Sequence, residues 1–105
     1  MIVVVGRVQT SQDRRDELIK LGQRVAQASR DEAGCIGYRL YENTEQANEF
    51  VVVEEWDSEE ALQRHFATAH IAAFMAAFPA TLSAQPDVQF HTIAETRTLA
   101  DVAGG

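Results

Sequence analysis

The chain has 105 residues, 46% of them hydrophobic, and a formal net charge of −7. A single domain of this length buries roughly 60–70% of its unfolded surface, so we expect one core and little room for a large cavity unless a second copy helps to enclose it. The acidic balance argues against nucleic acid and anionic membranes as partners, because both require clustered Lys and Arg.

Targeting and redox features are few. No apolar run approaches the ~20 residues of a membrane span. Residues 1–7 are apolar but lack a basic start and a small-residue cleavage site, which argues against a signal peptide. The single cysteine, Cys35, cannot form an internal disulfide and is interpreted as a small buried hydrophobe. We therefore expect a cytoplasmic protein.

The first part of the chain predicts a strand, a helix and a second strand. Residues 2–5 form a continuous β-branched run, as in a strand buried on both faces. Ser11 is placed to cap a helix whose apolar residues recur at helical spacing. Gly34 is expected to end that helix in the left-handed conformation. Residues 35–41 then alternate with a period of two, which predicts a strand.

A hairpin and a capped helix come next. Residues 43–48 are polar and predict the hairpin loop, which leads into a strand over residues 50–56. Asp57 or Ser58 is expected to cap the following helix, because two glutamates fill its first turn, where a negative charge favours the positive end of the helix dipole.

The last part of the chain predicts one more helical piece and one more strand. Thr68 is interpreted as the cap of a new helix over residues 70–82. Residues 88–93 alternate as a final strand. We assign residues 1–98 to a single domain and expect residues 99–105, which are small and polar, to form a flexible tail.

The predicted order is β-α-β-β-α-β, which is the α+β ferredoxin-like arrangement of an antiparallel four-stranded sheet with helices on one face. Yet residues 2–5 are apolar throughout, and the strand over residues 50–56 has apolar side chains on both of its faces. An apolar sheet face larger than a few hundred Å² is rarely left bare on a monomer. We therefore expect a homodimer packed sheet to sheet.

Three spaced patterns carry a resemblance to a known family. They are E-x-G-C-x-x-Y-x-L-Y from Glu32, F-V-x-x-E-x-W from Phe50, and L-x-x-H-x-x-T-x-H-x-x-x-F from Leu62. With this spacing the chain resembles the antibiotic biosynthesis monooxygenase family, including its quinol monooxygenase branch, over nearly its whole length. The resemblance implies a dimeric α+β barrel with a pocket between sheet and helices in each protomer.

The family implies its chemistry less firmly than its fold. Several members oxygenate hydroquinones, anthrones or related phenols without metal or flavin, whereas others isomerise a sugar derivative or break down haem. The haem-degrading members carry Asn, Trp and His where this chain has Gly6, His65 and Met75, so we do not expect haem breakdown.

His65 is the candidate catalytic base. A lone helix histidine is more often structural, but Glu54 and Trp56 lie two residues apart on a strand and so share a face. If that face meets the helices, an acid, an indole and an imidazole converge on one cavity. A buried carboxylate needs a partner, and His65 or Arg39 is available. We expect Glu54 to lie behind the imidazole and fix its tautomer.

Two interpretations of His70 remain open. In one continuous helix its ring would lie ~140° around the axis from His65, unlike the paired histidines of a zinc helix, so no metal site is predicted. If a new helix starts near His70, the residue either hydrogen-bonds the preceding turn or takes part in catalysis.

Aromatic side chains are the candidate substrate-binding walls. Trp56 and Tyr38 are either core aromatics or pocket lining, and Phe74 and Phe66 add apolar surface from the helices. Ionising a phenol of pKa ~10 at pH 7 costs about 4 kcal/mol, which a base and hydrogen-bond donors must largely offset. The phenolate can then give one electron to oxygen.

The sequence therefore predicts a cofactor-independent monooxygenase that acts on a quinol, an anthrone or a similar phenol with molecular oxygen. The alternative is a non-oxidative isomerase or a small-ligand-binding dimer on the same fold. Oxygen uptake separates the two.

Overall fold

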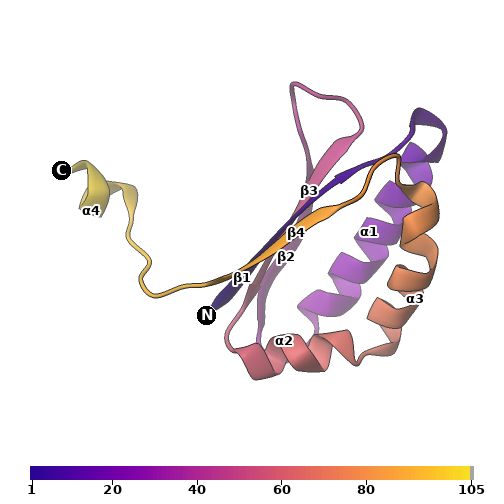
Figure 1. Cartoon of the computed structure of the whole chain (residues 1–105). Coiled ribbons are helices and arrows are strands. Elements are labelled where there is room, and N and C mark those ends of the chain that lie inside the picture. The colour runs from indigo at the N-terminus through magenta and orange to yellow at the C-terminus, as the bar shows by residue number, and fades with distance from the viewer. Residues whose placement is uncertain (105) are drawn as a thin grey trace.

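The computed structural model describes residues 1–104 as one antiparallel sheet with α1 and α3 against one face and α2 across one end (Figure 1). The strand order is β2-β3-β1-β4, so the first strand lies in the centre of the sheet. This order confirms the predicted α+β ferredoxin-like fold. The elements are β1 (Ile2–Gln9), η1 (Gln12–Arg14), α1 (Arg15–Arg30), β2 (Cys35–Glu42), β3 (Glu49–Trp56), α2 (Glu59–Phe66), α3 (Ala69–Ala77), η2 (Phe78–Thr81), β4 (Asp87–Thr92) and α4 (Leu99–Ala103).

The helix-covered face of the sheet holds the core. Strand register places Val4 of β1 beside Glu54 of β3 and Phe90 of β4, so alternate residues of the central strands point toward the helices. Burying a side chain of valine or leucine size stabilises the fold by roughly 1.5–3 kcal/mol. One buried cluster comprises Val4, Val25, Ala26, Tyr38, Trp56, Ala61, Leu62 and Ile71, and a second comprises Val8, Leu18 and Phe50.

The opposite face of the sheet is apolar and uncovered. Val3 and Val5 of β1 lie on it beside Val51 and Val53 of β3, and all four are only partly buried. Tyr41 of β2 pairs with Val51 on the same face and is more than half exposed. Within residues 1–104 no helix lies over these side chains (Figure 1). The predicted sheet-to-sheet homodimer would cover them, and it stays a prediction.

The first helix differs from its predicted boundaries. Ser11 precedes the short η1 turn, and its side chain makes no cap hydrogen bond there. Helix α1 ends at Arg30, so Gly34 lies in the turn that follows and not at the helix end. Gly34 does adopt the left-handed conformation, with φ of 87°. A Cβ atom there would lie 2.5 Å from that of Ala61, so glycine also permits the close approach of α2.

Two predicted caps are confirmed. The Ser58 hydroxyl accepts a hydrogen bond from the backbone N–H of Ala61 and begins α2. Thr68 accepts one from the N–H of Ile71 and begins α3. Each side chain satisfies an N–H group that the first helical turn leaves without an internal partner. The helical segment is therefore divided at the predicted break.

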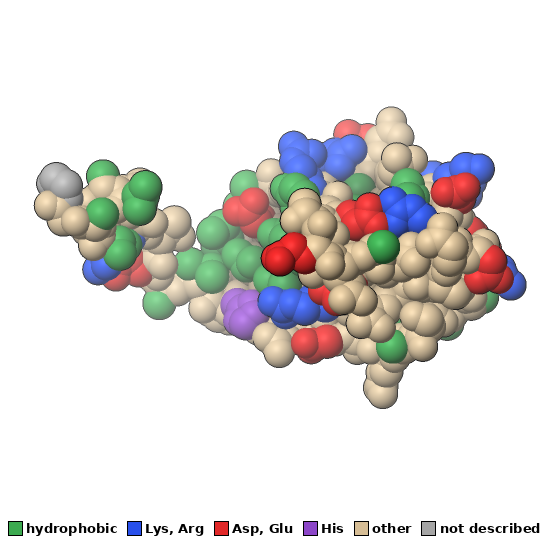
Figure 2. Space-filling view, turned by 90° about the horizontal axis from the view of Figure 1, so that it is seen from above, with side chains coloured by type: hydrophobic (Ala, Val, Ile, Leu, Met, Phe, Trp, Pro, Cys, Tyr) green, Lys and Arg blue, Asp and Glu red, His purple; other side chains and the backbone are tan. Residues whose placement is uncertain are grey.

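The C-terminal segment leads away from the domain (Figures 1 and 2). Strand β4 begins one residue earlier than predicted, at Asp87. Beyond it, Thr98 and Asp101 form a reciprocal capping box that starts α4, a short helix in the segment for which a flexible tail is predicted. In the space-filling view, apolar side chains gather on the surface beside this segment (Figure 2). No helix among the described residues is long and apolar enough to cross a membrane.

Candidate active site

His65 lies in the last turn of α2 and faces the sheet. Its position follows from the amphipathic spacing of that helix, in which Ala61, Leu62 and His65 are the buried residues. The imidazole is 1% exposed. Its ring centroid lies 4.6 Å from that of Trp56 and 5.7 Å from that of Tyr38. The predicted convergence of imidazole and indole is therefore present.

The break between α2 and α3 brings the two histidines together. The Thr68 hydroxyl donates a hydrogen bond to the backbone oxygen of His65 at 2.7 Å while it caps α3. The His65 and His70 ring centroids are 6.0 Å apart. In a single straight helix the two rings would diverge by ~140°, so the break creates this pairing.

Glu32 joins the two rings and is the site residue that the sequence analysis misses. It lies in the turn between α1 and β2. Its Oε2 atom is 2.7 Å from Nδ1 of His65 and 2.8 Å from Nε2 of His70. Glu54 is predicted to lie behind the imidazole, but the structure places Glu32 there. The available signal was that Glu32 opens the first family pattern, two residues before Gly34.

Glu54 lies on the other side of the imidazole. Its Oε1 atom accepts a hydrogen bond from Nε1 of Trp56 at 3.0 Å and lies 4.0 Å from Nε2 of His65. Glu54 is 8% exposed, and this burial raises the pKa of its carboxyl from 4.5 to about 7. The negative charge of Glu32 acts in the same direction, and hydrogen bonds from Trp56 and Tyr38 oppose it. Arg39, the other candidate partner, is exposed.

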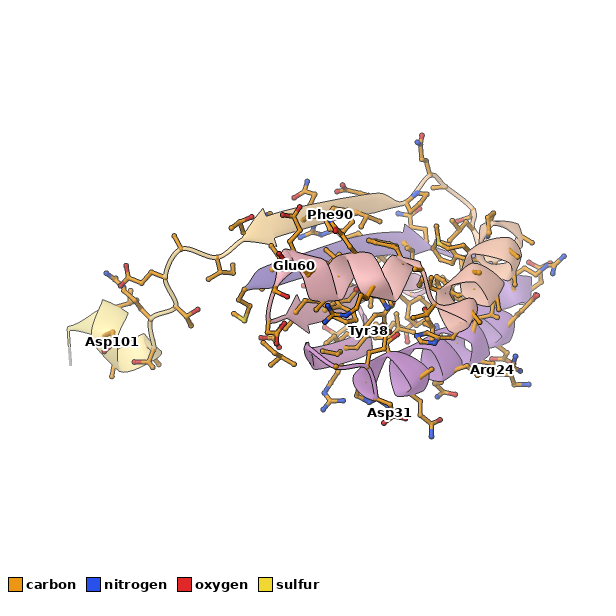
Figure 3. All side chains as sticks on the ribbon, turned by 90° about the horizontal axis from the view of Figure 1, so that it is seen from below. Arg24, Asp31, Tyr38, Glu60, Phe90 and Asp101 are labelled. Atoms are coloured by element: carbon orange, nitrogen blue, oxygen red, sulfur yellow. The ribbon has the colours of Figure 1, made fainter. Side chains whose placement is uncertain are left out.

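Tyr38 is the third polar residue of this cluster, with Glu54 and His65. Its ring is buried, and burial raises the pKa of its hydroxyl well above the usual range, with the nearby negative charge of Glu54 as the next cause. Tyr38 therefore stays protonated at neutral pH and can donate a hydrogen bond. Figure 3 shows it between the sheet and the helices.

A cavity of about 290 Å³ lies between the sheet and the helices. Its wall is almost entirely apolar and includes members of both core clusters. The space is close to the lower end of the roughly 300–1,000 Å³ typical of small-molecule sites. The predicted site residues that line it are Tyr38, Glu54, His65, Phe66 and Phe74.

Two predicted residues do not line this cavity. Trp56 is fully buried behind Glu54 and His65, so its contribution is to hold those two groups. His70 lies across Glu32 from His65. Toward solvent the cavity has an aromatic rim, which the predicted Phe66 forms with Phe90 of β4, a residue that was not predicted. Phe66 and Phe90 are each about half exposed, with ring centroids 6.2 Å apart.

Glu32, His65 and His70 could together offer three ligand atoms to a metal ion, because those atoms lie within 4.8 Å of one another. Zinc bonds of 2.0–2.1 Å at tetrahedral angles place neighbouring ligand atoms about 3.3 Å apart. The carboxylate oxygen of Glu32 is instead 2.7 and 2.8 Å from the two nitrogens, which are hydrogen-bond distances. The spacing fits shared protons better than a metal ion, and the absence of a required metal stays a prediction.

The arrangement defines which nitrogen of His65 can act as a base. With Glu32 ionised, Nδ1 carries the proton and donates it in the 2.7 Å hydrogen bond. Nε2 then holds the lone pair on the side of Glu54, and both residues line the cavity. A base and a carboxyl group with a pKa of about 7 thus meet at one apolar wall.

Comparison with known proteins identifies the family. The sequence model described as antibiotic biosynthesis monooxygenase matches residues 1–77. The chain belongs to the antibiotic biosynthesis monooxygenase family. The matched segment contains Glu32, Glu54, His65 and His70, whereas Phe90 of the cavity rim lies beyond it. The family resemblance expected from the three sequence patterns is therefore confirmed.

Individual relatives of this monooxygenase-family chain cover most of its length. The uncharacterised protein sll1783 of Synechocystis is 37% identical over 98 residues, which are 93% of this chain and 67% of that protein. YcnE of Bacillus subtilis, named as a candidate monooxygenase, is 36% identical over 88 residues, which are 84% of this chain and 93% of YcnE.

Solved structures share the fold over most of this chain. Rv0793 of Mycobacterium tuberculosis superposes with a TM-score of 0.86 at 26% identity, covering 92% of this chain and 98% of that one. A candidate antibiotic biosynthesis monooxygenase from Deinococcus radiodurans gives a TM-score of 0.88 at 24% identity, covering 94% and 98%, and this likeness supports the fold alone.

Proposed function

We propose that the protein is a cofactor-independent monooxygenase that oxidises a quinol, an anthrone or a similar electron-rich phenol with molecular oxygen. The observation that carries this proposal is the buried imidazole of His65. Its Nδ1 is held by Glu32 at 2.7 Å, and its Nε2 lies on the side of Glu54, at the wall of an apolar cavity. This geometry provides a base where a flat aromatic molecule would bind.

The proposed chemistry requires an ionised substrate. Ground-state oxygen reacts slowly with closed-shell molecules, so the phenol must first become an anion that can give up an electron. Nε2 of His65 takes the hydroxyl proton, and the protonated form of Glu54 or the hydroxyl of Tyr38 donates a hydrogen bond to the anion. Overall the substrate loses two hydrogen atoms and gains one oxygen atom, while the second oxygen atom leaves as water.

The apolar wall has a defined part in this reaction. Phe66 and Phe74 provide aromatic surface for a planar ring. Excluding water strengthens the interaction of the anion with Glu54 and His65, because the local dielectric is lower than in bulk solvent. It also keeps water away from the radical pair that forms when the anion transfers its electron.

Oxygen uptake tests the proposal. The purified protein is incubated with a panel of menadiol, simpler hydroquinones and anthrone while dissolved oxygen and product mass are followed, with and without a chelator such as EDTA. We expect at least one substrate to consume oxygen in step with a product one oxygen atom richer and two hydrogen atoms poorer, unaffected by the chelator. Loss of activity with EDTA that added metal restores, or no uptake above the uncatalysed rate with any substrate, contradicts the proposal.

One observation favours a second function, non-oxidative isomerisation. Glu54 and His65 provide two proton-transfer groups 4.0 Å apart, which is the arrangement that moving a proton between neighbouring atoms of one substrate needs. The discriminating condition is the absence of oxygen. An isomerase turns over at the same rate under nitrogen, whereas a monooxygenase stops.

We also propose that the protein acts in the cytoplasm as a homodimer joined through the uncovered sheet face. Val3, Val5, Val51 and Val53 give that face an apolar centre, which a second copy would bury. Light scattering at micromolar concentration should give about twice the chain mass, and Val53→Lys should shift it toward the single-chain mass. A wild-type protein that stays monomeric contradicts the assembly.

A further inference from the structure

The polar part of the site extends beyond the cavity. Glu32 and His70 do not line the cavity, yet they form a continuous chain of short hydrogen bonds with His65, which does. Side-chain exposure rises along this chain from 1% for His65 to 14% for Glu32 and 27% for His70. The three residues therefore connect the buried imidazole to the molecular surface.

The rest of the surroundings of His65 offers no comparable connection among the described residues. The aromatic rings of Trp56, Tyr38 and Phe66 lie around the imidazole. Glu54 faces Nε2 and is itself buried on the cavity side. Nδ1 is thus the nitrogen from which a proton can reach solvent through polar atoms alone.

We propose that Glu32 and His70 form a proton relay that carries protons between His65 and solvent. The proposal rests on the role of His65 as the base in the proposed function. Under it Glu32 and His70 are positioning and relay residues that act through His65. His70, for which two interpretations were open, receives a defined role.

The relay balances protons over the reaction. The substrate hydroxyl gives its proton to Nε2 of His65 and keeps the electron pair of the broken O–H bond. At the start His70 is protonated on both nitrogens, and its Nε2–H donates the 2.8 Å hydrogen bond to the ionised Glu32. The Nδ1 proton of His65 passes to the Glu32 carboxylate as His70 gives up its own Nδ1 proton. His70 releases that Nδ1 proton to water. When the second oxygen atom is reduced to water, one proton returns by the same path, so no net proton is gained or lost.

The relay can be tested without a substrate. Nuclear magnetic resonance of nitrogen-15-labelled protein measures how fast the Nδ1 proton of His65 exchanges with water. The His70→Gln variant keeps an amide that can donate to Glu32 but cannot accept and release a proton. The His70→Ala variant leaves a gap that imidazole from the buffer can enter. His91→Gln is the matched control, because His91 is exposed on β4, where it pairs with Val3 on the uncovered face of the sheet.

We expect His70→Gln to slow this exchange by about tenfold or more, a part of the 10²–10⁴-fold that proton-transfer groups contribute. His91→Gln should exchange as wild type does. In His70→Ala, added imidazole should speed the exchange toward the wild-type rate. Wild-type exchange in His70→Gln, equal slowing in His91→Gln, or slow exchange in His70→Ala that imidazole does not restore overturns the relay.

The outcome is separable from that of the proposed function. If oxygen uptake fails but the exchange rates behave as expected, the relay stands and the oxidative chemistry is wrong. If a substrate is oxidised but His70→Gln exchanges as fast as wild type, the monooxygenase stands and the relay is wrong.

Discussion

The two faces of the sheet are built from the same strands but differ in what their polar residues can do. Glu54 and Glu55 are neighbours on β3 and point to opposite sides. Glu54 is buried beside Trp56 and His65, and its carboxyl pKa rises to about 7. Glu55 is partly exposed on the uncovered face, where it pairs with Gly37 of β2. Covering one face with helices therefore raises the pKa of one carboxyl toward neutrality, where the proposed function uses it in proton transfer.

The same contrast holds for the histidines. His65 is enclosed by aromatic rings and held by Glu32, whereas His91 stands exposed on the edge strand β4. Position in the fold thus decides the chemistry more than residue type does. To test this, a substitution on the helix-covered face is compared with one on the uncovered face, and a substitution in the domain is compared with one in α4.

The largest expected effect on stability is at Trp56. Trp56→Ala removes a fully buried indole and its hydrogen bond to Glu54, so we expect a loss of roughly 3–5 kcal/mol in the free energy of unfolding. Tyr41→Ala on the uncovered face removes a ring that is more than half exposed in the single chain, so it should cost less than Trp56→Ala even where the proposed dimer covers it. Urea unfolding followed by circular dichroism measures both. Equal costs would break the comparison.

A smaller effect on stability is expected from Glu54→Gln, and its size depends on pH. Because the folded carboxyl has a pKa of about 7 and its ordinary value is 4.5, the folded state holds a proton between these values that the unfolded state has released. Wild-type stability therefore falls as pH rises through this interval, by roughly 3 kcal/mol from this group. The glutamine variant lacks this pH-dependent contribution, so its stability relative to that of the wild type should rise between pH 4.5 and 7.

Glu55→Gln is the matched control for this pH dependence, since it changes the same side chain on the uncovered face. Denaturant unfolding at several pH values gives the difference between each variant and wild type. A difference for Glu54→Gln that does not change with pH would mean that the carboxyl titrates in the folded state as it does in the unfolded chain.

The smallest expected effect on stability is that of Thr68→Ala. Thr68→Ala removes the cap of α3 and the hydrogen bond to the backbone oxygen of His65, so we expect a loss of about 1 kcal/mol in stability. Thr98→Ala removes the same kind of cap from α4, which stands away from the domain, and should leave domain stability unchanged (Figure 1). Thermal unfolding of both variants checks this. Equal losses would mean that α4 is coupled to the domain.

Much of the fold could be predicted from the sequence because its signals are local. Alternating or continuous apolar runs mark the strands, and Ser58 and Thr68 mark the starts of α2 and α3 with the residue types that cap helices. The boundary errors arise where local signals compete. Gly34 is left-handed as predicted, but the reasons are a turn and the close approach of α2. The sequence pattern of a helix end does not distinguish these reasons from the end of a helix.

The site was predicted less completely because its contacts join distant segments. Glu54, His65 and the aromatic residues could be grouped from strand alternation and helix position. Glu32 could not, because it reaches His65 from a turn, where no periodicity predicts the direction of a side chain. The pairing of His65 with His70 likewise depends on the angle at the α2–α3 break, which the sequence indicates only as a break.

Oxygen uptake by His65→Ala, compared with His91→Ala, tests the central claim most directly. The assay uses the substrate on which the wild-type protein is most active, and circular dichroism confirms that each variant is folded. We expect His65→Ala to lose roughly 10²–10⁴-fold in rate, because the base that ionises the substrate is gone, while His91→Ala keeps the wild-type rate. A His65→Ala protein that is folded and oxidises the substrate at the wild-type rate would contradict the account.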